Sequence, residues 1–152
     1  MLIREKNRSL DELNEMYVQT YRSLGIDRVY EILKNYYQAD RKQIIQYHAS
    51  MLVCREFNIM SINELFKSKK RGVRTQALMC LYILFERKGI VNEVVDFQNI
   101  TGMPYHSCYC IKSLVKKLDL NLITDKKFLD RVNKINKELD DFIENFLNKQ
   151  FD

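Results

Sequence analysis

Apolar residues recur along most of this chain at spacings of three and four, the pattern of helices that bury one face. Ser9 and Ser61 each lie three residues before a glutamate, so each can form a capping box that opens a helix. Further helix starts are expected at Asp27, Asp40, Val73, Asn92, Pro104 (or the next residue) and Thr124. The pattern predicts a chain that is helical over most of its length.

Two of these segments indicate where the core lies. The segment from Val73 to Lys88 is strongly apolar, which predicts a largely buried helix that ends at Gly89. The last helix carries apolar residues spaced 4, 3, 4, 3 and 4 from Phe128 to Phe146. His48 lies among apolar residues of an earlier helix and is interpreted as a packed core histidine.

Composition supports the same fold class. The 152 residues include four glycines and one proline, whereas average usage is about 12 % of residues. A multi-stranded sheet needs such residues at its turns, so their scarcity favours an all-α protein. Apolar residues make up 46 %, and the length fits one domain. We expect a single all-α helical bundle over residues 1–152.

The net charge of +5 is concentrated in one part of the chain. Residues 51–88 carry eight basic and three acidic residues, and most of the excess lies in the loop at 67–74. A basic loop in an otherwise neutral protein is typical of nucleic-acid binding, although lysines also serve solubility.

Residues 97–118 have the form of a helix-turn-helix. Gly102 allows a tight turn, and the second helix carries an apolar stripe formed by Cys108, Ile111, Val115 and Leu118. Its outward side therefore presents Tyr105, His106, Ser107 and Tyr109, followed by Lys112, Lys116 and Lys117. In such motifs the start of the second helix reads base edges in the major groove.

Four further sequence motifs follow one another along the chain: VCREFNI at 53–59, INEL at 62–65, TQALMCLY at 75–82 and DKKFLDRV at 125–132. With the basic loop and the helix-turn-helix between them, they resemble the C-terminal DNA-binding domain of the bacterial replication initiator DnaA. The resemblance covers roughly 85 residues. It implies a DnaA domain IV or Trp-repressor-like module at 46–140, with helical extensions at 1–45 and 141–152.

The basic loop, the helix-turn-helix pattern and the resemblance to the DnaA domain together define the expected DNA contacts. Base reading is assigned to Met103, Pro104, Tyr105, His106 and Ser107. Contacts to the DNA backbone are assigned to Lys67, Lys69, Lys70, Arg71, Arg74, Thr75, Gln76, Lys112, Lys116 and Lys117. The expected function is sequence-specific binding of double-stranded DNA, in replication initiation or transcriptional regulation, for example in a phage or mobile element.

The recognition segment departs from the family pattern, which reads near G-G-R-D-H-[ST]-T-V. Placing that valine on Cys108 keeps the later apolar positions in phase, whereas sliding by one residue moves Lys116 into the core. The first register is preferred because burying a lysine is costly. The aspartate is absent in both registers, so the family's DNA sequence preference is not implied. Its ATPase domain has no counterpart in these residues.

Enzymatic chemistry, cofactors and metal ions are not expected. His106, Cys108 and Cys110 alternate between helix faces, and no C-x-x-C pair exists. There are two histidines and no phosphate-binding glycine loop. Four cysteines without a secretion signal, and no apolar run near 20 residues, predict a cytoplasmic, nucleoid-associated protein that does not contact a membrane.

Two alternatives stay open. Phe142 and Phe146 extend beyond the resemblance, and they either pack against N-terminal helices at 9–38 or form a homodimer contact through the C-terminal helix. The alternative function is a helical protein–protein adaptor that keeps the fold without binding DNA. Residues 1–45 are the expected contact for such a protein partner.

Overall fold

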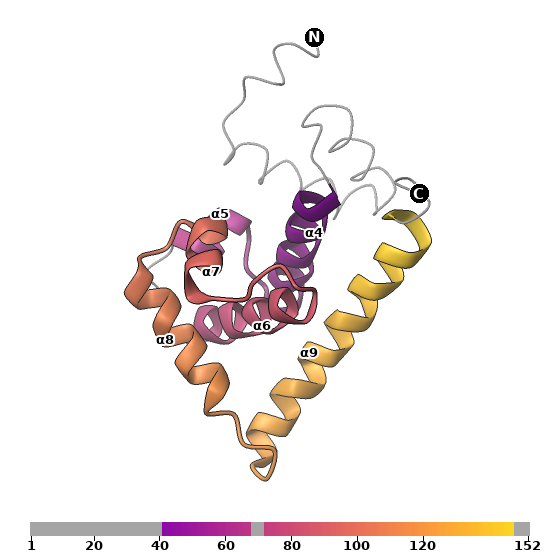
Figure 1. Cartoon of the computed structure of the whole chain (residues 1–152). Helices are drawn as coiled ribbons and strands as arrows, with labels where there is room; N and C mark the ends of the chain where they lie inside the picture. The colour runs from indigo at the N-terminus through magenta and orange to yellow at the C-terminus, as the bar shows by residue number, and fades with distance from the viewer. Residues whose placement is uncertain (1–40, 68–71, 148–152) are drawn as a thin grey trace.

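The computed structural model describes residues 41–67 and 72–147, and the secondary structure of this part of the chain is helical, without strands (Figure 1). Its helices are α4 (Arg41–Glu56), α5 (Ile62–Lys67), α6 (Val73–Arg87), α7 (Val94–Thr101), α8 (Tyr105–Lys116) and α9 (Ile123–Phe142), and a π-helical turn, η2 (Ile143–Leu147), follows α9. The predicted all-α helical bundle is confirmed. The helices expected before residue 40, with the Ser9 and Asp40 caps, lie outside the described residues.

Helix α6 is the centre of the bundle. All nine residues from Ala77 to Phe85 are buried, as the apolar run predicted. Helix α6 packs against α4, α5, α8 and α9, so each of these can place an apolar face on it. Gly89 follows the helix with a φ of 72°, a left-handed conformation that favours glycine.

Helix α9 buries the stripe that its spacing predicted. Its buried residues are Phe128, Val132, Ile135, Leu139 and Phe142. The helix packs along α4 and α6. It runs without interruption across residues 140 and 141, the expected boundary between the DnaA-like module and the C-terminal extension. Helix α4 is likewise continuous across residues 45 and 46, the expected boundary between the N-terminal extension and the module.

No helix in the described part of the chain is long and apolar enough to cross a membrane.

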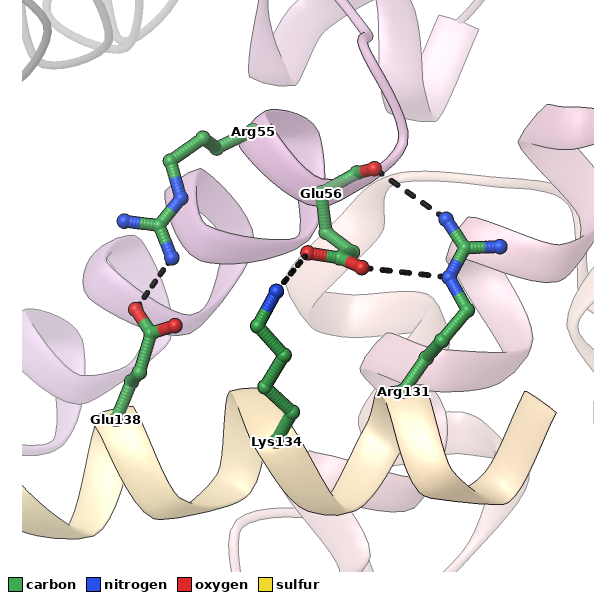
Figure 2. Close-up of polar contacts among 5 residues, drawn as sticks. All are labelled: Arg55, Glu56, Arg131, Lys134 and Glu138. Atoms are coloured by element: carbon green, nitrogen blue, oxygen red, sulfur yellow. Dashed lines mark hydrogen bonds and ion pairs between the residues drawn. The ribbon is translucent and has the colours of Figure 1, made fainter. Parts of the chain in front are cut away.

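Charged side chains join the end of α4 to the middle of α9 (Figure 2). The Glu56 carboxylate accepts from Arg131 Nε at 3.3 Å and from Lys134 Nζ at 3.4 Å, while Arg55 pairs with Glu138. The Arg131 guanidinium also lies 4.1 Å from the centre of the Phe57 ring. These contacts help to fix the register of the two helices, because Arg131, Lys134 and Glu138 of α9 all have partners in the last turn of α4.

Phe142 is a core residue and is not available for a homodimer contact. Its side chain is 3 % exposed and stacks on the His48 ring at 4.0 Å between centroids. His48 is 1 % exposed, which confirms its interpretation as a core histidine. The side chain of Phe146 and the helices expected at 9–38 lie outside the described residues.

Two predicted helix caps are wrong by one or two residues. Helix α7 begins after Glu93 rather than Asn92, and the Asp96 carboxylate accepts from both of their N–H groups at 3.0 and 2.9 Å. These bonds hold the pKa of the Asp96 carboxyl below its usual range. Helix α9 begins at Ile123, which places Thr124 inside the helix.

Candidate nucleic-acid interface

Helices α7 and α8 are joined by a three-residue turn, residues 102–104. Gly102 has a φ of 72° and donates its N–H to the Gln98 carbonyl at 2.8 Å, which ends α7. Thr101 Oγ1 donates to the Phe97 carbonyl at 2.8 Å and accepts from the Met103 N–H at 3.2 Å. The buried threonine therefore ties the turn to α7 and sets the direction in which α8 leaves it.

The inner face of α8 follows the predicted stripe. Cys108 and Ile111 are 0 % and 6 % exposed, and α8 packs against both α6 and α7. Val115 and Leu118 are half-buried, whereas Lys116 is exposed. The exposure of Lys116 agrees with the helix phase that the preferred register requires.

The outward face of α8 is polar and aromatic in its first half and basic in its second. Tyr105 and Tyr109 are 53 % and 52 % exposed, and between them His106 is exposed and Ser107 half-buried. Along the second half, Lys112 is half-buried and Lys116 and Lys117 are exposed. Pro104, also exposed, immediately precedes the helix. Within the described part of the chain, most of this face is exposed to solvent, and only Ser107 and Lys112 are half-buried.

Met103 does not belong to this face. Its side chain is 4 % exposed and its Sδ lies 4.0 Å from the Arg74 guanidinium. Assigning base reading to Met103 is therefore wrong for this arrangement, because the side chain fills space beneath the turn. The sequence gives no helical period inside a turn, so it could not place this residue inside or outside.

Arg74 is committed to the fold rather than open to a phosphate. Its Nε donates to the Leu65 carbonyl at 2.8 Å and its Nη2 to the Phe66 carbonyl at 2.9 Å. These are carbonyl groups of the last turn of α5, where a cation is favourable. Burial lowers the pKa of Arg74 from its ordinary high value. Its assignment as a DNA-backbone contact is therefore corrected to a clamp between α5 and the start of α6.

The other predicted backbone contacts near α6 differ in exposure. Gln76 and Lys67 are exposed and Thr75 is half-buried. Lys69, Lys70 and Arg71 lie outside the described residues. Helix α8 and helix α5, which ends at Lys67, both pack on α6, and Gly72 is the N-cap of α6.

Arg74→Lys tests the clamp, because it keeps the charge but loses the planar fork that reaches two carbonyls. We expect the free energy of unfolding to fall by about 1–3 kcal/mol, measured by urea denaturation. The exposed neighbour Gln76→Ala is the control and should change stability by less than about 0.5 kcal/mol. If Arg74→Lys leaves stability unchanged, the carbonyl contacts do not hold α5.

An exposed apolar group at the α8–α9 junction was not predicted. This junction, here called the tip, carries Leu114, Leu120, Leu122 and Ile123, which are 38 %, 68 %, 53 % and 73 % exposed. It lies at the lower end of the molecule in Figure 1. Asp119 Oδ1 accepts from the Asn121 N–H at 2.9 Å, and Asp125 Oδ2 accepts from the Asp119 N–H at 2.9 Å. The only sequence signal for the tip is three apolar residues, Leu120, Leu122 and Ile123, that lie outside the apolar stripes of α8 and α9.

No protein-family model, curated protein or solved structure matches the chain. The resemblance to the DnaA domain therefore stays a prediction from the order and spacing of its motifs.

Proposed function

We propose that this protein binds double-stranded DNA in a sequence-specific manner through the outward face of α8. The proposal rests on how the residues of that face are distributed, with aromatic and polar side chains at the start of the helix and lysines at its end. Exposed Tyr105 and His106 stand at the helix start, directly after a short turn, and exposed Lys116 and Lys117 stand at its end. A recognition helix uses these positions for base edges and for phosphates respectively.

The chemistry of the first turns suits base reading. The Tyr105 and Tyr109 hydroxyls and the His106 ring can each donate and accept hydrogen bonds, and the Ser107 hydroxyl lies between them. Because α8 is anchored by Cys108 and Ile111 on its inner side, these groups are presented from a rigid element. Contacts made from a rigid helix lose little conformational entropy on binding.

The resemblance to the DnaA domain supports the same proposal through motifs that lie outside α8 as well as through the helix-turn-helix. It implies a role in replication initiation or in transcriptional regulation, and a phage or mobile element is a natural setting for such a module. Nucleoid association would follow from DNA binding.

Salt dependence of duplex binding tests the proposal. Fluorescence anisotropy with a labelled random duplex should show affinity falling steeply with salt, because phosphate contacts release counterions. The double variant Lys112→Gln with Lys116→Gln should reduce the slope of log K against log salt by about 2, since each phosphate contact contributes about 0.9. The matched control, Lys42→Gln with Lys137→Gln, removes the same charge from α4 and α9 and should leave most of the slope intact. Absence of duplex binding at low salt would exclude the proposal, and equal effects of the two pairs would exclude α8.

Selection of preferred duplexes from a random pool tests the base-reading assignment. Tyr105→Ala and His106→Ala should each change the selected sequence, while Gln76→Ala should weaken binding without changing it. If neither substitution on α8 changes the selected sequence, another part of the protein reads the bases.

The tip favours the second candidate, a helical protein–protein adaptor. Four large apolar side chains gathered on one junction are typical of a protein contact. The adaptor function predicts no salt-dependent duplex binding by the whole protein, so the titration above separates the two candidates.

A further inference from the structure

His106 and Cys110, whose side-chain types are common metal ligands, lie one helical turn apart on the outward face of α8. His106 and Cys110 are both exposed, and Cys110 Sγ lies 3.5 Å from His106 Nε2. Because the two residues are four positions apart, the helix itself holds them on the same face. The pair is not part of the apolar stripe that anchors α8.

Their separation fits a metal chelate. A tetrahedral zinc ion with a thiolate sulfur at about 2.3 Å and an imidazole nitrogen at about 2.0 Å keeps these two atoms about 3.5 Å apart. The sulfur and nitrogen of this pair already have that spacing in the absence of an ion. To share an ion, the two side chains would need to turn toward a common position without changing the separation of these atoms.

Among the four cysteines and two histidines of the chain, His106 and Cys110 are the ones exposed to solvent. Cys54, Cys80 and Cys108 are 0 % exposed, and the other histidine, His48, is 1 % exposed. Burial raises the pKa of the Cys80 thiol to about 12, which makes that sulfur a poor ligand. Cys110 is thus the one cysteine of the four that a dissolved ion can reach.

Such a site would be open rather than closed. Within the described residues, no group of three or more histidine, cysteine, aspartate or glutamate side chains is arranged to hold a metal. Two ligands leave the remaining positions to water or to an external ligand.

We propose that His106 and Cys110 form an exposed two-ligand chelate for a borderline-soft divalent ion such as Zn²⁺. On binding, the Cys110 thiol releases its proton to solvent and the sulfur bonds to the ion as thiolate, while the neutral His106 ring bonds through Nε2.

The chelate also bears on DNA recognition, and this step rests on the proposed function. His106 belongs to the base-reading positions, so a bound ion removes its Nε2 from hydrogen bonding. The ion and the duplex should therefore compete for the start of α8.

Titration of the full chain with Co²⁺ tests the chelate directly. We expect a near-ultraviolet thiolate-to-cobalt charge-transfer band that Zn²⁺, which is spectroscopically silent, abolishes by displacement. Cys110→Ser should eliminate the band, and His106→Gln should weaken Co²⁺ binding by about tenfold or more, because one arm of the chelate is lost. The matched control combines Cys110→Ser with Ser113→Cys. This double variant keeps the number of thiols on α8 unchanged but moves one of them out of reach of His106. Absence of a band in the wild type, or an unchanged affinity in His106→Gln or in the control, would overturn the proposal.

The link to DNA is tested separately by measuring duplex affinity with and without Zn²⁺. Zn²⁺ should weaken duplex binding in the wild type and not in Cys110→Ser, and equal weakening in both would overturn the competition. If Co²⁺ binds as expected but no duplex is bound at any salt concentration, the chelate stands and the DNA-binding proposal fails.

Discussion

Replacing Phe97 with alanine is expected to lower the free energy of unfolding by about 3–5 kcal/mol, the usual cost of deleting a large buried ring. Phe97 is 0 % exposed, and its ring centroid lies 5.1 Å from that of Tyr82 and 6.2 Å from that of Phe85, edge-on to both. It is the largest side chain that α7 places in the core. Its removal leaves a cavity between α6 and α7, because no other side chain of α7 reaches the Tyr82 and Phe85 rings in a ring contact.

Urea denaturation followed by circular dichroism measures this loss, with two variants as controls. Val95→Ala, on the exposed side of the same helix, should change stability by less than about 0.5 kcal/mol. Phe97→Leu keeps part of the volume and should cost clearly less than alanine. A loss below about 1 kcal/mol for Phe97→Ala would mean that α7 is not held on α6 by this ring. Since α7 and its turn set the start of α8, the alanine variant should also weaken duplex binding.

Helices and core were the predictable part of this fold, because they are recorded in local periodicity. The burial of α6 from Ala77 to Phe85 and the stripe from Phe128 to Phe142 follow from spacing alone. Boundaries were less accurate. Asn92 and Thr124 have good capping side chains, but α7 begins after Glu93, whose N–H donates to Asp96, and α9 begins at Ile123.

Charged residues were the least predictable part, because their partners come from distant segments. In the sequence Arg74 looks like one more cation of a basic loop, yet two carbonyls of α5 bind it. Glu56 and Arg131 lie 75 positions apart and meet only when α9 packs on α4. The outward face of α8 could be predicted because the apolar positions Cys108 and Ile111 show which side of the helix is buried. Met103 lies in a turn, where no helical period indicates whether a side chain is buried or exposed.

His48 gives the second large expected effect, a loss of stability as the pH falls. Its ring lies against Phe142 between α4 and α9, and burial, aided by the positive charge of Arg55, lowers its pKa to about 3. A histidine in the unfolded chain has a pKa near 6.5. Between these two values the unfolded chain binds a proton that the folded protein does not, so lowering the pH through this window favours unfolding.

The expected cost is about 1.4 kcal/mol for each pH unit below about 6, measured as the free energy of unfolding in urea at pH 7, 6 and 5. The range above pH 5 is chosen because most carboxylates stay ionised there and contribute little. His48→Gln and His48→Leu cannot take up this proton, so both should lose the slope whatever their stability at pH 7. His106→Gln, which removes the exposed histidine, should retain it. If the wild type shows no slope between pH 6 and 5, or if the His48 variants keep the wild-type slope, His48 is not the group that couples protonation to folding.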